Sequence, residues 1–154
     1  MPGFSAPRAP HGARSAARLS LVPLYLPDPN AFSRHIRGHD GGLSAKFAAE
    51  FGRVRLSTLV LAELEFGAAK SGLARHRGRL DGLLATIPIE AFTHQDAGHY
   101  GRLRATLQRR GEMIGPLDAL IAAQALRLGA TIVTHNLNEF QRVPGLRCED
   151  WQEA

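Results

Sequence analysis

Four polar stretches of the sequence could supply oxygen ligands to a cation. Asp28 ends the apolar run "LYLPD", Glu63 lies in "STLVLAELEFG", and Asp118 lies in "GPLDALIAAQALRLGA". The fourth stretch, "VTHNLNEF", offers Asn136 and Glu139. Carboxylate and amide oxygens are hard ligands that suit Mg²⁺ or Mn²⁺. If these groups meet at one place, their mutual repulsion predicts a cation between them.

Each of these groups also has a purely structural interpretation. Asp28 stands between Pro27 and Pro29, as a turn residue does. An acid in the first turn of a helix, where Asp118 is expected, interacts favourably with the helix dipole. Glu63 is flanked by apolar residues on a helix expected to be buried, where a carboxylate is costly unless it is paired or metal-bound. The fourth stretch could form a turn or face solvent.

The elements that must position these groups alternate along the chain. Apolar runs predict strands at 21–27, 53–57, 87–91, 130–134 and, more weakly, 146–149. Helices are expected at 31–37, 42–51, 58–70, 73–85, 94–110 and 116–128. This alternation predicts an α/β fold with a mostly parallel sheet covered on both faces. The carboxyl ends of such strands share one edge, so the polar stretches should converge there.

The length of 154 residues fits one domain with a substantial core. Residues 1–18 are rich in Ala, Pro, Arg and Gly and are expected to be a disordered extension, which leaves 19–154 for the domain. The single cysteine, Cys148, excludes an intrachain disulfide and indicates a reducing compartment such as the cytoplasm. No apolar run approaches the ~20 residues of a membrane-spanning helix. The run "LSLVPLYLP" is interrupted by prolines and has no cleavage site, so no secretory signal is expected.

The net charge of +5 comes mostly from arginine, because lysine occurs only at positions 46 and 70. Such a basic surface favours the binding of polyanions, and nucleic acid is the first candidate. Arg34, Arg37 and the segment 75–79 are candidate phosphate contacts, although charged helix faces are usually just solvated. The sequence contains no P-loop, dinucleotide fingerprint or nucleophile elbow.

Taken together, the motifs resemble PIN-domain ribonucleases of the VapC toxin type. The resemblance covers about residues 22–151 and rests on "LSTLVLAELEFG", "IGPLDALIAAQALRLGATIVTHN" and "NEFQRVPGLRCEDW". It implies a three-layer α/β/α sandwich with a short parallel sheet, in which clustered acids bind Mg²⁺ for RNA cleavage. It also implies an antitoxin partner that blocks the site, and a homodimer.

Matched position by position, Asp28, Glu63 and Asp118 correspond to the three central acids of the family and would hold Mg²⁺ or Mn²⁺. Asn136 stands where many members have an acid, so Glu139 is expected to supply the fourth charge. Positions that would support the site or orient water are Ser57, Asn30 and Thr134. The implied reaction is hydrolysis of RNA, with structured RNA such as tRNA the first candidate, by a metal-activated water.

The first motif departs from the family at two positions. Pro27 replaces the usual aliphatic residue, and Pro29 replaces the usual small hydroxyl residue. Proline lacks the N–H that a central strand donates, so a ladder that continues past residue 26 should weaken the strand and displace Asp28. Two alternatives stay open. One is an impaired PIN-fold module that binds antitoxin or RNA without cleaving, and the other is a metal-dependent phosphatase or DNA nuclease.

Overall fold

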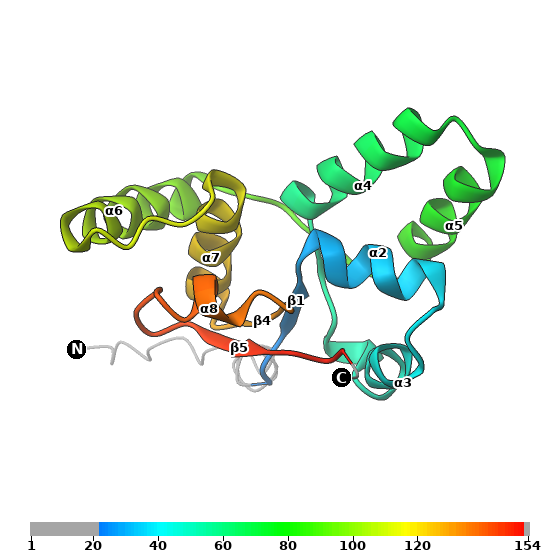
Figure 1. The fold of residues 1–154 in the computed structure, drawn as a ribbon, viewed down its shortest axis with the longest axis horizontal. Helices are drawn as coiled ribbons and strands as arrows, with labels where there is room; N and C mark the ends of the chain where they lie inside the picture. The colour runs from blue at the N-terminus through cyan, green and yellow to red at the C-terminus, as the bar shows by residue number, and fades with distance from the viewer. Residues whose placement is uncertain (1–21, 153–154) are drawn as a thin grey trace, which may run out of the picture.

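The computed structural model describes residues 22–152 (Figure 1). Its strands are β1 (Tyr25–Pro27), β2 (Leu56–Ser57), β3 (Ile89–Glu90), β4 (Thr131–Val133) and β5 (Arg147–Glu149). Its helices are α2 (Pro29–Arg37), α3 (Gly41–Ala49), α4 (Thr58–Ser71), α5 (Ala74–Leu84), α6 (His94–Arg110), α7 (Pro116–Leu128) and α8 (Leu137–Phe140), with a 3-10 turn at Phe51–Arg53. The expected extension at 1–18 lies outside the described residues, as do both ends of the expected domain, 19–21 and 153–154.

The strands and helices expected from the sequence are all found, within a few residues of their expected limits. The short helix α8 was not expected, because four residues are too few to show a helical period. Pro116 begins α7, and Gly129 ends it with a positive φ of 62°, which glycine adopts without steric cost. Local sequence signals therefore locate nearly every element.

The strands are parallel and form a short sheet in two parts. β4 lies between β1 and β5, with Leu26 opposite Ile132 and Ile132 opposite Cys148. β2 and β3 form a second ladder, which an isolated bridge from Tyr25 to Val54 connects to β1. Helices α6 and α7 lie on one side of the strands, and α2, α4 and α5 lie on the other (Figure 1). The expected α/β class with a short parallel sheet is confirmed.

Pro27 accounts for the separation of the two parts. The carbonyl of Tyr25 accepts from the N–H of Arg55 at 2.9 Å, so this residue faces the β2 side. The N–H of Asp28 donates to the carbonyl of Val133 at 2.9 Å, so this residue faces the β4 side. Backbone groups alternate in direction along a strand, so the missing N–H of Pro27 falls on the β2 side, where the pairing stops. The expectation that a ladder past residue 26 would displace Asp28 is therefore wrong.

The core lies between the strands and the helices and reaches into the α6–α7 pair. Asp96 on α6 is 0% exposed, and it accepts hydrogen bonds from the Arg127 guanidinium of α7. No helix within residues 22–152 is long and apolar enough to cross a membrane. The largest fully buried side chains are Phe32, Phe47, Phe140, Leu26, Leu43, Leu56, Leu107, Ile121, Ile132, Gln124, Val54 and Val60.

Candidate active site

Asp28 lies at the carboxyl end of β1 and is the N-cap of α2. Its side chain is buried, with 5% of the residue exposed. One carboxylate oxygen, Oδ1, accepts from the backbone N–H of Ala31 at 2.8 Å, which satisfies a free donor at the start of the helix. Pro29 occupies the first helical position, where its missing N–H costs nothing. The two prolines therefore leave Asp28 firmly placed at the sheet edge.

Thr134 joins the ends of β1 and β4. Its hydroxyl donates to Oδ2 of Asp28 at 2.7 Å and accepts from the backbone N–H of Asn136 at 2.9 Å. Thr134 is buried, so this hydroxyl is held in one orientation by the two bonds. The predicted supporting position at Thr134 contacts the predicted ligand Asp28.

Asp118 and Glu139 form a second acidic group, at the start of α7 and in α8. A hydrogen bond between the two carboxyl groups contributes to the titration of both. Glu139 also accepts from the backbone N–H of Gly115 and from Nδ2 of Asn136. A Cβ placed on Gly115 would lie 3.4 Å from Oε1 of Glu139 and 3.5 Å from Oδ2 of Asp118. Both carboxylates therefore border the same point of the backbone.

The charges of this site shift its pKa values in opposite directions. Burial, then the negative charge and hydrogen bond of Glu139, then the charge of Asp28, raise the pKa of Asp118 to about 7. The N–H of Gly115 is the main cause that lowers the pKa of Glu139. Burial raises the pKa of Asp28, although hydrogen bonds from Thr134 and two backbone N–H groups oppose the rise. Asp118 therefore holds a proton up to near neutral pH.

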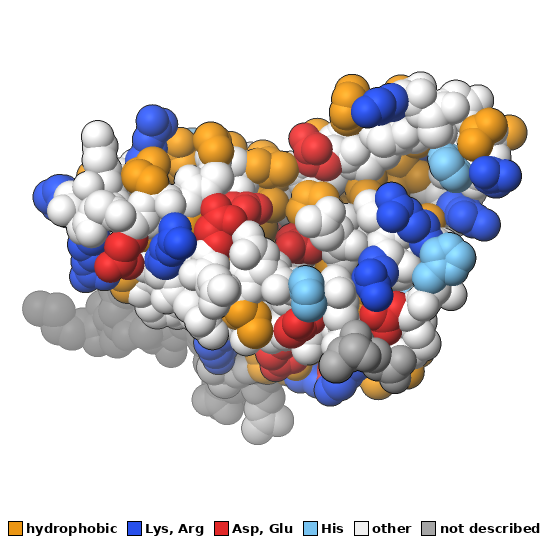
Figure 2. All heavy atoms as spheres, viewed as in Figure 1, with side chains coloured by type: hydrophobic (Ala, Val, Ile, Leu, Met, Phe, Trp, Pro, Cys, Tyr) orange, Lys and Arg blue, Asp and Glu red, His pale blue; other side chains and the backbone are white. Residues whose placement is uncertain are grey.

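Figure 2 shows a group of acidic side chains near the middle of one face, where the surface is hollowed between the α6–α7 side and the α4–α5 side. Within residues 22–152, no three Asp, Glu, His or Cys side chains are arranged to surround a metal ion as they stand. Asp28, Asp118 and Glu139 nevertheless offer carboxylate oxygens, the ligand type that hard divalent cations take. A cation near Asp118 would replace its proton and remove the repulsion that retains it.

The expectation that Glu63 is buried is wrong. The buried residues of α4 are Val60 and Leu64, whereas Glu63 is exposed and Phe66 is 62% exposed. Figure 1 shows α4 running away from the strands, and Ala62, Glu63 and Phe66 are exposed along it. Glu63 lines a hollow between α2, α4 and α5 instead of meeting Asp118 in the core.

Ser57 and Asn30 lie apart from the paired acids Asp118 and Glu139. The hydroxyl of Ser57 caps α4 by accepting from Leu59 N–H at 3.2 Å and donates to Oε1 of Gln124 at 2.5 Å. The amide of Gln124 in turn donates to the carbonyl of Glu90 at 3.1 Å, so Ser57 helps to tie β2, β3 and α7 together. Asn30 is exposed on the first turn of α2 and borders a second hollow, described below.

The two candidate RNA-binding arginines differ in their partners. Nε of Arg34 donates to Asp40 at 2.9 Å, in an ion pair whose acid is buried. Arg37 is exposed at the last turn of α2, and no carboxylate lies within 4 Å of its guanidinium in the described part of the chain. Arg37 is thus the better placed of the two to meet an external anion.

Two interactions near the site were not predicted from the sequence. The backbone N–H of Gly115 donates a hydrogen bond to Glu139. The Gly115–Pro116 pair, which is typical of a helix start, was the one sequence feature that pointed to this position. Nδ1 of His135 lies 2.8 Å from Oδ2 of Asp150, next to the Thr134–Asp28 contact along the chain. A carboxylate only accepts, so Nδ1 of His135 carries the hydrogen of this bond. No rule of residue spacing connects positions 135 and 150, so the contact between His135 and Asp150 could not be predicted from the sequence.

A family model described as PIN domain matches residues 25–146, which include all four candidate acids. The tRNA(fMet)-specific endonuclease VapC of Salmonella typhimurium is 34% identical over 128 residues, which cover 82% of this chain and 97% of that protein. Ribonuclease VapC2 of Rickettsia felis is 34% identical over 135 residues, 84% of this chain and 99% of that protein. The solved structure of VapBC2 from Rickettsia felis, bound to a DNA fragment from their promoter, contains a similar chain. That chain has a TM-score of 0.78 and 32% identity, over 84% of this chain and 99% of its own length.

Proposed function

The chain belongs to the PIN-domain family and is related to VapC ribonucleases over most of its length, and on this basis we propose that it is a ribonuclease toxin of a toxin–antitoxin pair. The observation that carries the proposal is the pairing of Asp118 with Glu139 within reach of the charge of Asp28. Such a group of carboxylates on one hollowed face is suited to phosphodiester hydrolysis with a divalent cation.

We propose Mg²⁺ as the cofactor, with Mn²⁺ as a substitute, held by Asp28 and Asp118 and completed by Glu139. When bound, the ion supplies a water of lowered pKa and polarises the scissile phosphate. Thr134 keeps the carboxylate of Asp28 in its orientation, and Gly115 with Asn136 keeps that of Glu139. Asp118 gives up the proton that it holds to near pH 7 and then presents an ionised oxygen.

The substrate that we propose is structured RNA, with tRNA the first class to test, because the Salmonella typhimurium relative carries that specificity in its name. A cognate antitoxin is the proposed partner, since similar solved structures are of VapBC proteins. We also propose a homodimer and a cytoplasmic location, where such RNA is found. The impaired binding module is less well supported, because the prolines leave Asp28 hydrogen-bonded to β4 and Thr134.

A cleavage assay tests the proposal. Purified antitoxin-free protein is incubated with total RNA and Mg²⁺, beside an EDTA control and the Asp118→Asn variant, and the new RNA ends are sequenced. Cleavage by the parent protein that both controls abolish is the expected result, and the positions of the ends identify the RNA class. Cleavage that survives both controls would exclude the metal–carboxylate mechanism. A parent protein that binds antitoxin but cleaves nothing would favour the impaired module.

A further inference from the structure

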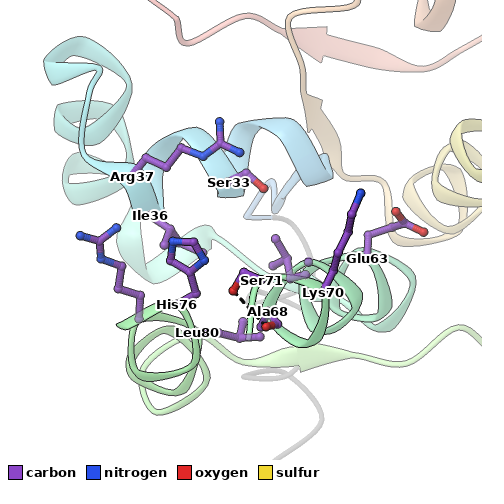
Figure 3. A pocket seen from close by; sticks show the side chains of 12 residues that line it. Ser33, Ile36, Arg37, Glu63, Ala68, Lys70, Ser71, His76 and Leu80 are labelled. Carbon is purple, nitrogen blue, oxygen red and sulfur yellow. Dashed lines mark hydrogen bonds between the residues drawn. The ribbon is translucent and has the colours of Figure 1, made fainter. Parts of the chain in front are cut away.

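A hollow of about 430 Å³ lies between α2, α4 and α5 (Figure 3). Apolar side chains line part of it, among them Ile36 of α2, Leu64 of α4 and Leu80 of α5. Arg37 and Lys70 extend from α2 and α4 at its rim (Figure 3). The hollow thus combines an apolar floor with a basic edge.

A second hollow, of about 390 Å³, continues this one towards the acids. It is bordered by Asn30, His135 and Gln152, and it shares Ser33 and Arg37 with the first. Ser33 and Arg37 are four residues apart and therefore lie on one face of α2. The two hollows form one trough along α2, which begins beside the N-cap Asp28 and extends about 13 Å by helical rise to Arg37.

Three cations that line the trough lack acidic partners, whereas Arg34, which borders the second hollow, is paired with Asp40. In the part of the chain that the structure describes, no carboxylate lies within 4 Å of the charged nitrogens of Arg37, Lys70 or Arg79, all three of which line the first hollow. Arg77 of α5 lines neither hollow, and it pairs with Glu65 and Asp81. Unpaired cations along one trough create a local positive potential that attracts a polyanion.

On the basis of the proposed function, we infer that this trough holds the strand of substrate RNA that runs away from the cleavage site. Phosphate groups of the strand contact Arg37, Lys70 and Arg79, and bases rest on the half-buried apolar side chains of Ile36 and Ala68. Charged contacts to phosphate position a strand, and apolar surfaces accept unstacked bases without regard to sequence. An exposed carboxylate, Glu63, marks the trough wall on α4 and would repel phosphate, so the strand passes nearer to α2 and α5.

A binding experiment tests the trough separately from catalysis. The affinity of a short fluorescein-labelled single-stranded RNA of mixed sequence is measured by fluorescence anisotropy in EDTA, over a series of salt concentrations. Arg37→Ala and Arg79→Ala are each expected to weaken binding by about 5- to 10-fold and to lower the salt slope by about 0.7, the value for one phosphate contact on single-stranded nucleic acid.

Arg102→Ala is the matched control. Arg102 is an exposed arginine on α6 that is not among the residues of either hollow, so its removal changes the net charge equally. The control is expected to bind RNA like the parent protein. An equal loss of RNA affinity in all three variants would mean that only the net charge matters, and it would overturn the inference.

The remaining outcomes separate the trough from the proposed function and from a peptide occupant. Trough-dependent RNA binding by a protein that cleaves no RNA would support the trough and reject the ribonuclease. RNA cleavage with unchanged binding by Arg37→Ala and Arg79→Ala would reject the trough alone. Unchanged RNA binding combined with weakened capture of the antitoxin would assign the trough to a peptide and also overturn the inference.

Discussion

The hydroxyl of Thr134 donates a 2.7 Å hydrogen bond to the carboxylate of Asp28, although the two residues are 106 positions apart in the sequence. Parallel pairing of β1 with β4 produces this contact, since both residues follow the last paired positions, Pro27 and Val133. Both groups are buried, so water cannot substitute for either partner. The contact fixes the orientation of a carboxylate that is central to the proposed site.

We predict that Thr134→Val destabilises the protein by about 1–3 kcal/mol, because it leaves a buried carboxylate oxygen without its donor. RNA cleavage should fall by about 10- to 100-fold, as expected when a group that orients a metal ligand is removed. Thr131→Val is the control, since it makes the same change in the adjoining strand β4, at a buried residue that does not bond Asp28. Urea denaturation and initial cleavage rates measure the two effects, and equal losses in both variants would contradict the assigned role.

Asp118 should make the metal-free protein less stable as the pH rises from about 4 to 7. Its pKa is raised from 3.8 to about 7 in the folded state, so the folded protein binds the extra proton in this interval and stability declines with pH. Because the group is partly exposed, we expect a difference on the order of 1–2 kcal/mol, below the full value of the shift.

Denaturation in EDTA at pH 5 and pH 8 measures this effect, with Asp118→Asn as the comparison. The asparagine variant cannot titrate at this position, so its stability should decline less between the two pH values. Glu139→Gln removes the neighbouring charge and should move the decline to lower pH. If parent and Asp118→Asn show the same pH dependence, Asp118 has an ordinary pKa.

Pro29→Thr is expected to leave the cleavage rate and the Mg²⁺ affinity nearly unchanged. Pro29 is the first residue of α2, and the cap at Asp28 does not depend on it. The change should cost about 0.5–1 kcal/mol of stability, because proline restricts the unfolded chain. Isothermal titration with Mg²⁺, together with cleavage rates, is the measurement. A clear gain in affinity would mean that Pro29 does impair the site.

Asp96→Asn should destabilise the α6–α7 pair by about 3–5 kcal/mol, because it leaves Arg127 without its buried acidic partner. Burial alone would raise the pKa of Asp96, but hydrogen bonds from Arg127 and Thr93 outweigh it and hold the pKa below its usual value. The stabilisation is therefore present above about pH 4 and is lost as the pH falls through the lowered folded pKa.

Thermal melts at pH 7 and pH 3 check this prediction, and the difference between parent and Asp96→Asn should shrink at the lower pH. Asp81→Asn is the comparison for an exposed ion pair, since Arg77 is its partner at the surface. That variant should melt close to the parent protein at both pH values. A large effect of Asp81→Asn would show that surface pairs matter more here than burial predicts.

Most of the fold follows from signals that lie within a few residues of one another. Gly129 after the last periodic residue and Pro116 at the first helical position locate α7 to the residue. The apolar runs before Asp28 and Thr134 identify β1 and β4, and parallel order then requires their carboxyl ends to meet. The sequence by itself therefore determined the elements and the meeting of Asp28 with the "VTHN" segment.

The tertiary structure alone decided how each acid is surrounded. Glu63 sits on an apolar helix, yet it is exposed, because α4 leaves the sheet and a local pattern cannot show which neighbours a helix will have. The pKa of Asp118 is raised first by burial and then by Glu139, which is 21 positions away and is held by the N–H of Gly115. Burial and charge coupling depend on distances between segments that are remote in the chain, so no periodicity in the sequence records them.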